Sequence, residues 1–325
     1  MESTIIKVST IPTMSSSGNN IAFIFAHRPT DVWNTPLSVV REFIRRGWDA
    51  KIYSLFNETD NYVSSNIQAL IDDSNSGVFI PDIVMYMDWG RFDSHLLDRN
   101  NISTSYWVME SGDDPQNFDK NSVKAERFHL VLTPAHDSYL KYKEKGSDVL
   151  WWTHFADTAI HKPYSSFTPF DELPPVRTTR GPNASSIMDY LSQIMEDRFI
   201  NRNGLSGEEY GDFLNSGKIV FQHSRWQEVT RRVFEGMACG KLVIADKLPE
   251  HTHIDDLFVE GEDIIYYENI YDCISKINYY LSSEGESERE RIAQNGYNKV
   301  INSHTQIQRV DAIIEKYNQW KKSSR

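Results

Sequence analysis

The stretch RRVFEGMACGKLVIADK, residues 231–247, has the pattern of a short helix, a tight turn and a buried strand. Gly236, Ala238 and Gly240 are small enough to let such a helix lie close on a sheet, and Gly240 is placed to end it. The apolar run that follows has the composition of a central strand. The stretch therefore predicts an α/β unit in which the helix N-terminus points to the carboxyl edge of the sheet.

The same alternation of strand and helix patterns continues on both sides of this stretch. Strand patterns lie at 20–28, 49–56, 82–89, 103–110, 128–135, 147–155, 218–222 and 263–267. Helix patterns lie between them and continue to the C-terminus, at 35–48, 61–73, 137–146, 185–197, 206–217, 269–283, 285–301 and 305–321. Alternation with short loops indicates parallel, doubly wound sheets.

The length of 325 residues suits two domains of roughly 150 residues each. A proline-rich stretch from about 163 to 185 has the texture of an interdomain connection. We expect a flexible lead-in at 1–20, an N-terminal Rossmann-like acceptor domain at 21–165 and a C-terminal Rossmann-like donor domain at 166–304. A last helix at 305–325 is expected to cross back to the N-terminal domain. The fold class is thus α/β, with two tandem Rossmann-like domains facing each other across a cleft.

Composition excludes several classes of protein. The formal net charge of −12 opposes sequence-independent nucleic-acid binding, which depends on excess Lys and Arg. No run of about 18 apolar residues is present, so no membrane span is predicted, and the first residues lack the apolar core of a signal peptide. The two cysteines, Cys239 and Cys273, fit a reducing compartment and a cytoplasmic location. No feature points to a particular oligomeric state.

The start of the helix at 231 has the character of a phosphate site. Thr230 is a plausible N-cap, and unpaired N–H groups behind it favour an anion. Arg225, Arg231 and Arg232 surround this point, and guanidinium groups bind phosphate oxygens well. Glu235, one turn deeper, is placed to accept hydrogen bonds from ribose hydroxyls. The alternative is a solvated Arg pair with Glu235 as its ion-pair partner on an exposed face.

Several segments resemble the CgeB-like (spore maturation protein) glycosyltransferases. The strongest likeness lies in RVFEGMACG (232–240), KLVIAD (241–246) and LFVEGEDIIYY (257–267). A weaker likeness extends to STSYWVMESGDDPQNFD (103–119) and to the stretch from Phe128 to Pro163. The resemblance implies a GT-B fold, which consists of two Rossmann-like domains, and a nucleotide-sugar donor.

The resemblance also implies roles for residues near the helix. Glu235 matches the second glutamate of a Glu-x7-Glu motif that holds the ribose in retaining relatives. The first glutamate falls at position 227, where this chain has Gln227 with Glu228 beside it. Retaining and inverting stereochemistry therefore both stay open.

Further candidate residues follow the strands of the N-terminal half. Glu110, Asp113 and Asp114 lie beyond a strand end, where carboxylates can act as a base or bind acceptor hydroxyls. Asp88 has the same placement, and His27 closes the first strand. Each has a structural alternative, namely a capping carboxylate or a buried histidine.

A second group of candidates lies near the domain junction. His154 and Asp157 are cleft-lining if the resemblance holds, or part of a turn if it does not. Arg180 falls where relatives place a first strand of the C-terminal domain and a phosphate-facing loop, and Trp226 is either a lid that stacks on a base or an interface wedge. No spacing of His, Cys or carboxylates suits a metal, so no metal is predicted.

These observations predict a metal-independent glycosyltransferase with no cofactor other than its nucleotide-sugar co-substrate, for which a UDP-sugar is favoured. The acceptor is left open among a small molecule, a glycan, a protein and a modified DNA base such as a hydroxymethyl-pyrimidine. One alternative is a non-catalytic nucleotide-sugar-binding or partner-binding module, which is favoured by Gln227 in place of the motif glutamate. Another is a sugar epimerase.

Overall fold

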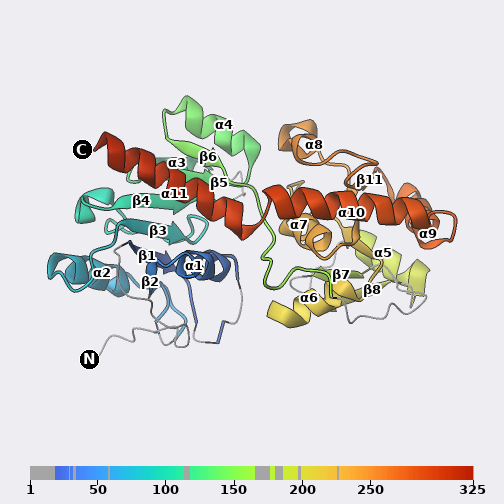
Figure 1. Ribbon diagram of the computed structural model, residues 1–325, viewed down its shortest axis with the longest axis horizontal. Helices are drawn as coiled ribbons and strands as arrows, with labels where there is room; N and C mark the ends of the chain where they lie inside the picture. Colours follow the sequence, from blue (N-terminus) through green and yellow to red (C-terminus); the bar gives the residue numbers. More distant parts are fainter. Residues whose placement is uncertain are drawn as a thin grey trace. The chain divides into compact units, whose positions relative to one another are not determined.

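The computed structural model describes residues 19–28, 30–31, 34–57, 59–112, 118–164, 176–179, 186–196, 199–224 and 227–324. Its chain divides into two units, which Figure 1 shows with the helices and strands labelled. Unit 1 comprises Met1–Thr153 and Arg309–Arg325, and unit 2 comprises His154–Gln308. Most of the predicted lead-in, residues 1–18, lies outside the described residues.

Unit 1 contains a sheet in which every neighbouring pair of strands is parallel, in the order β2-β1-β3-β4-β5-β6. Its strands are β1 (Asn20–Phe25), β2 (Asp49–Ser54), β3 (Ile83–Met87), β4 (Tyr106–Glu110), β5 (Leu130–Thr133) and β6 (Val149–Trp151). The helices are α1 (Thr35–Arg45), α2 (Ser65–Asn75), η1 (Arg99–Ile102), α3 (Phe118–Ala125) and α4 (His136–Glu144). β3 is buried at every position because both faces of a doubly wound sheet are covered.

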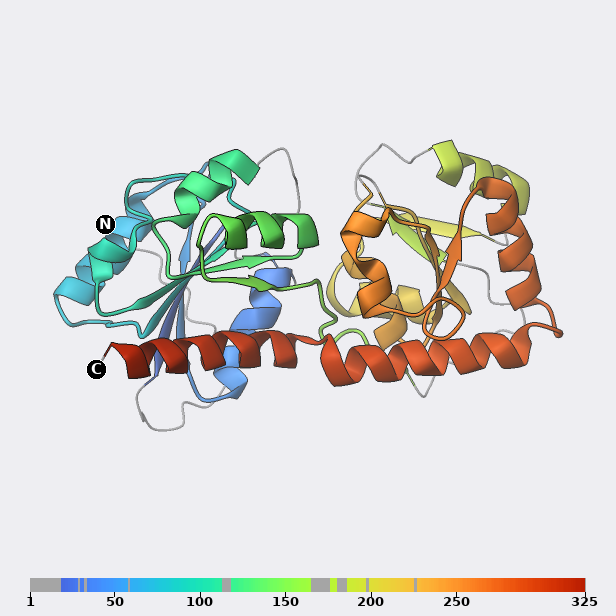
Figure 2. The ribbon, with the colours of Figure 1, turned by 90° about the horizontal axis from the view of Figure 1, so that it is seen from above.

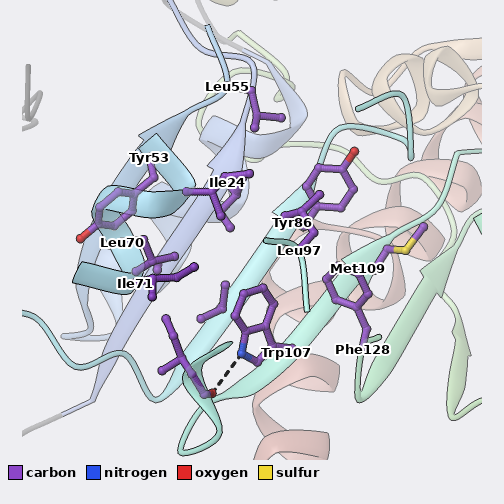
Figure 3. Close-up of a cluster of buried hydrophobic side chains, with 14 of the residues drawn as sticks. Ile24, Tyr53, Leu55, Leu70, Ile71, Tyr86, Leu97, Trp107, Met109 and Phe128 are labelled. Atoms are coloured by element: carbon purple, nitrogen blue, oxygen red, sulfur yellow. Dashed lines mark hydrogen bonds between the residues drawn. The ribbon is translucent and has the colours of Figure 1, made fainter. Parts of the chain in front are cut away.

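The core on one face of this sheet is drawn in Figure 3. Ile24, Tyr86 and Trp107 come from neighbouring strands, while Leu70 and Ile71 come from α2. The indole nitrogen of Trp107 donates to the carbonyl oxygen of Ile102 at 3.2 Å, so the largest buried side chain also satisfies its polar atom.

The last helix, α11 (Gln306–Ser323), packs mainly in unit 1. Its Trp320 ring lies 5.3 Å from that of Tyr106, and the Tyr317 hydroxyl donates to Asp82 at 2.7 Å. Figures 1 and 2 both show α11 running along this unit. The chain therefore needs its C-terminus to complete the core of its first half.

Unit 2 contains a second parallel sheet, in the order β11-β10-β9-β7-β8. Its strands are β7 (Val176–Thr179), β8 (Ile200–Asn203), β9 (Ile219–Gln222), β10 (Leu242–Asp246) and β11 (Ile265–Tyr267). The helices are α5 (Ser186–Met195), α6 (Gly207–Asn215), α7 (Arg231–Ala238), η4 (Glu250–Thr252), α8 (Ile254–Leu257), α9 (Ile270–Leu281) and α10 (Glu286–Ser303).

Two strands of unit 2 differ from the sequence-based expectation. The proline-rich stretch at 163–185 has the local pattern of an interdomain connection, yet it includes β7, which pairs with both β8 and β9, in the place where the resemblance implies a first strand. β8 was not predicted, because INRN lacks the apolar run of a central strand. It lies at the edge of the sheet, where only one neighbouring strand has to be matched.

Gly236 lets α7 lie directly on β9 and β10, as the sequence predicts. A Cβ atom there would lie 2.9 Å from two side-chain atoms of Val220 and 3.1 Å from Val243. The helix ends at Ala238 with Cys239 as its C-cap, and Gly240 follows with a φ of +70°, which suits glycine. The close packing of α7 on the sheet therefore depends on the absence of a side chain at position 236.

We expect Gly236→Ala to lower the free energy of unfolding by about 1–3 kcal/mol, because the added methyl overpacks two buried valines. Helix propensity alone would change stability in the opposite direction by up to about 1 kcal/mol, so the sign is informative. Urea unfolding measures it, with Ser192→Ala on the exposed side of α5 as the control. An equally or more stable Gly236→Ala protein would contradict the packing described here.

Candidate functional site

Both sheets have a topological switch point, where the strand order reverses. It lies between β1 and β3 in unit 1 and between β7 and β9 in unit 2. In open parallel sheets, ligands bind outside the carboxyl ends of the strands at such points. Residues that follow β1, β3 and β9 are therefore the first candidates in each unit.

The carboxyl edge of unit 2 carries a polar cluster. The Ser224 backbone N–H, just after β9, donates to Asp246 Oδ1 at the end of β10 at 2.8 Å. His223 Nδ1 lies 2.7 Å from the hydroxyl of Tyr267, which ends β11. These four residues are not among the candidates predicted from the sequence. The sequence feature that could have identified them is their position at the ends of neighbouring strands.

The N-terminus of α7 lies next to this cluster. Thr230 is its N-cap in extended conformation, as predicted, although its side chain makes no capping hydrogen bond. Arg232 donates to the side-chain oxygen of Gln222, the last residue of β9. Arg231 Nε lies 3.9 Å from Glu235 Oε1. Two guanidinium groups therefore accompany the positive end of the helix dipole at the switch point.

Glu235 is buried, with only 4% of its surface exposed. The Tyr210 hydroxyl donates to Oε2 at 2.6 Å, and His161 Nε2 lies 3.9 Å from Oε1. Burial opposes ionisation, but His161, Arg231 and the Tyr210 hydrogen bond together hold the pKa of Glu235 below its usual value. The burial of Glu235 corrects the alternative in which its side chain lies on an exposed helix face, and its role as a ribose ligand stays a prediction.

His161 and Asp157 support the Glu235 carboxylate from a turn. Asp157 Oδ1 accepts from the N–H of Ala159 at 3.0 Å, which is the turn-forming alternative foreseen for this residue. The Asp157 backbone N–H donates to His161 Nδ1 at 3.0 Å, so the neutral imidazole carries its proton on Nε2, towards Glu235. Burial lowers the pKa of His161. His154, at the start of unit 2, is half-buried.

The remaining donor candidates have varied placements. Gln227 is exposed and has a φ of +55°, and Glu228 is half-buried. Arg180, Arg225 and Trp226 lie outside the described residues, as do Asp113 and Asp114 of the catalytic candidates.

At the carboxyl edge of unit 1, the structure brings three candidates to neighbouring strands. His27 follows β1, Asp88 follows β3, and Glu110 ends β4 in register with Met87 of β3. All three are buried. His27 Nδ1 lies 3.6 Å from Asp31 Oδ2, and burial lowers the pKa of its imidazole.

Asp88 has an unusual environment. Its Oδ1 accepts a long hydrogen bond from the Tyr62 hydroxyl at 3.3 Å, while no residue in the described part of the chain donates to Oδ2. Burial raises the pKa of Asp88 to about 6, against the smaller effects of Tyr62 and Arg91. A carboxyl group with a pKa near neutrality can exchange protons with a substrate.

Neither a metal group nor a membrane helix is found where the structure is described. Within these ranges, no three residues among His, Cys, Asp and Glu lie together as metal ligands would. None of the helices described has the length and apolar character required to span a bilayer.

A comparison with models of known families finds a match in the second half of the chain. The model of the glycosyl transferase-like family matches residues 186–315, which run from α5 into α11 and include β9 and α7. A comparison of the sequence with curated proteins gives no match.

Solved structures resemble the whole chain. A sucrose-phosphate synthase from Thermosynechococcus elongatus is 11% identical with a TM-score of 0.66, covering 94% of this chain and 100% of its own. HepE from Anabaena, solved in complex with UDP and glucose, is 12% identical with a TM-score of 0.63, covering 93% and 100%. A putative UDP-N-acetylglucosamine 2-epimerase from Listeria monocytogenes is 11% identical with a TM-score of 0.57, covering 91% and 94%. The predicted class of two Rossmann-like domains, the GT-B fold, is confirmed.

Proposed function

We propose that the protein is a glycosyltransferase that transfers a sugar from a nucleotide-sugar, preferably a UDP-sugar, to an acceptor bound by unit 1. The observation that carries the proposal is the α7 N-terminus at the switch point of unit 2, with Arg231 and Arg232 beside it. This helix lies within the residues that match the glycosyl transferase-like family. The UDP in the HepE structure supports the choice of nucleotide. We also propose that the protein belongs to the CgeB-like glycosyltransferases.

In this proposal the donor diphosphate binds at the N-terminus of α7. Arg231 and Arg232 stabilise the negative charge that develops on the nucleotide as it leaves, so the reaction needs no divalent metal. Glu235 holds Arg231 through their ion pair and is the proposed ribose ligand. The unit 1 residues His27, Asp88 and Glu110 are the proposed acceptor-side groups.

A thermal-shift panel of UDP, GDP, ADP and dTDP tests the donor site. We expect UDP to stabilise the protein most, and we expect transfer to continue at the same rate in excess EDTA. Absence of stabilisation by every nucleotide at millimolar concentration would remove the donor site. Loss of transfer in EDTA would contradict metal independence.

We expect Arg232→Gln to weaken UDP binding by about 10- to 100-fold, because a charge-assisted hydrogen bond contributes roughly 1.5–3 kcal/mol. Calorimetric titration of UDP measures the affinity. Arg291→Gln is the control, since Arg291 is an exposed α10 residue that donates to the backbone oxygen of Gly261. An unchanged affinity in a folded Arg232→Gln protein would show that α7 does not hold the diphosphate.

A non-catalytic nucleotide-sugar-binding or partner-binding module is the second candidate. It is favoured by Gln227, which replaces the glutamate of the motif and has an exposed side chain. The two functions separate in one assay, because a binding module retains UDP-glucose unchanged. Release of UDP from UDP-glucose in the presence of the protein would exclude this alternative.

A further inference from the structure

The turn after β3 has a strained backbone. The Arg91 N–H donates to the Asp88 carbonyl oxygen at 2.9 Å, and the two residues between them, Trp89 and Gly90, have φ values of +50° and +69°. This is the pattern of a type I′ turn. Gly90 adopts such a conformation without strain, but a bulky Trp89 does so at a cost in free energy. Strain of this kind at a switch point is typical of a turn retained for function.

Buried groups hold this turn in place. Lys124 of α3, only 1% exposed, donates to the carbonyl oxygens of Gly90 and Phe92, both at 2.6 Å. The Tyr86 hydroxyl also donates to Phe92 at 2.8 Å. Asn121 packs so closely on Gly90 that a Cβ atom would lie 2.1 Å from its Oδ1. The backbone beside Asp88 is therefore preorganised by the core of unit 1.

The Asp88 carboxylate is left incompletely satisfied in this rigid setting. The side chain is only 8% exposed, yet Oδ2 accepts no hydrogen bond from the residues described around it. The groups whose charge or hydrogen bonds act on the carboxylate are Tyr62, Arg91 of its own turn, the backbone N–H of Phe92 and Lys124 of α3. Buried carboxylate oxygens normally have donors, so this oxygen points to a ligand hydroxyl that supplies one.

Aromatic side chains accompany Asp88. Tyr62, which donates to Asp88, is 41% exposed and stacks on Phe92 with ring centroids 5.5 Å apart. Phe56 meets Tyr62 edge to face at 5.0 Å. Aromatic faces with a few fixed polar groups are typical of small-molecule sites, and sugar rings offer matching C–H faces and hydroxyls.

The charge of the surroundings argues against a phosphate-bearing acceptor. Arg28, which lies 4.8 Å over the Phe56 ring, is paired with Asp60 at 2.8 Å. The whole chain carries a formal charge of −12. A neutral saccharide therefore fits this edge of unit 1 better than a nucleic acid does.

We propose that Asp88, Phe56, Tyr62 and Phe92 form the acceptor site, that the acceptor is a neutral saccharide, and that Asp88 is the catalytic base. This rests on the proposed glycosyltransferase function. The acceptor hydroxyl oxygen bonds to the anomeric carbon of the donor while its proton passes to Asp88 Oδ2. The bond from the anomeric carbon to the phosphate oxygen breaks, and its electron pair leaves on the nucleoside diphosphate. This single displacement inverts the anomeric configuration.

Asp88→Asn is the direct test, with UDP-glucose as donor and glucose, galactose, N-acetylglucosamine and maltose as acceptors. We expect the transfer rate to fall by about 10²–10⁴-fold, as for loss of a general base. Calorimetric affinity for UDP should be unchanged, because unit 2 binds it. The matched control is Asp148→Asn, which changes an exposed aspartate immediately before β6, at the opposite edge of the same sheet, and should transfer at the wild-type rate.

Two Tyr62 variants test the site without removing the base. Tyr62→Phe removes a hydrogen bond that lowers the pKa of Asp88, so the acidic limb of the pH–rate profile should move to higher pH. Tyr62→Leu removes the exposed aromatic face, so KM for the saccharide should rise by about 3- to 10-fold while KM for UDP-glucose stays the same. A pH profile unmoved in Tyr62→Phe would contradict the assigned base.

The outcomes separate this inference from the proposed function. A wild-type protein that neither binds UDP nor consumes UDP-glucose removes both. A wild-type protein that transfers glucose, with an Asp88→Asn variant that keeps more than a tenth of the rate, overturns the base alone. Transfer to an oligonucleotide or a peptide but to none of the saccharides overturns the acceptor class, and retention of the anomeric configuration overturns the single displacement.

Discussion

Glu235→Ala should lower the free energy of unfolding by about 3–5 kcal/mol, the usual cost of breaking a buried ion pair from one side. The substitution leaves the largely buried Arg231 guanidinium without its carboxylate and removes the acceptor for Tyr210. It also leaves a cavity beside His161. Urea unfolding monitored by tryptophan fluorescence measures the loss.

The pH dependence gives a further check on this prediction. Because the pKa of Glu235 is lower in the folded chain than its ordinary value of 4.5, its stabilisation is fully present above about pH 4.5. It is lost as the pH falls through the folded pKa, so the difference between wild type and Glu235→Ala should shrink in acid.

Two other substitutions serve as controls for the stability lost in Glu235→Ala. Glu209→Ala, on the exposed side of α6, should change stability by less than about 0.5 kcal/mol. Glu235→Gln keeps an acceptor for Tyr210 and should cost less than Glu235→Ala, while nucleotide affinity falls if Glu235 binds the ribose. Full stability of Glu235→Ala would contradict the buried position described here.

Asp88→Asn should have the opposite effect and raise the free energy of unfolding at neutral pH by up to about 3 kcal/mol. The pKa of Asp88 rises from 3.8 to about 6 on folding, and each pKa unit corresponds to about 1.36 kcal/mol. A group with a raised folded pKa stabilises the protein fully below its unfolded pKa, and this stability is lost as the pH rises through the folded pKa. The gain from Asp88→Asn should therefore appear between about pH 4 and pH 6 and vanish below about pH 4.

Urea unfolding at several pH values measures this gain, with Asp148→Asn as the exposed control. A buried catalytic carboxylate with too few hydrogen-bond donors destabilises the folded protein, so replacing it should stabilise the fold. If Asp88→Asn were instead less stable than wild type at neutral pH, the carboxylate would be a structural group, and its proposed role as base would lose its physical basis.

The sheet architecture could be predicted because strands and helices each have a recognisable local sequence pattern. Strands such as β3 are buried at every position and read as continuous apolar runs, and the helices between them have their own periodicity. β8 was not predicted because its residues, INRN, are mostly polar, and its strand character comes from pairing with β7 at the edge of the sheet. β7 lies in a stretch whose prolines dominate the local pattern, so it was implied by the family resemblance and not by local periodicity.

The candidate site was predictable to a similar extent. The N-terminus of α7 could be located from Thr230, two arginines and Gly240, which are all local signals. The burial of Glu235 could not, since Tyr210 and His161 approach it from other segments through tertiary packing. In the same way, Gly90 hints at a turn after β3, but nothing in the sequence shows that Lys124 of α3 holds it.

The proposed transfer of a sugar from a nucleotide-sugar can be tested in a single incubation. Wild-type protein is incubated with UDP-glucose and the saccharide acceptors in EDTA, and UDP and glycoside are quantified together by mass spectrometry. We expect UDP and a new glycoside in equal amounts, with little UDP formed when acceptor is omitted. UDP-glucose recovered unchanged, or converted to an isomeric nucleotide-sugar without any acceptor, would contradict it.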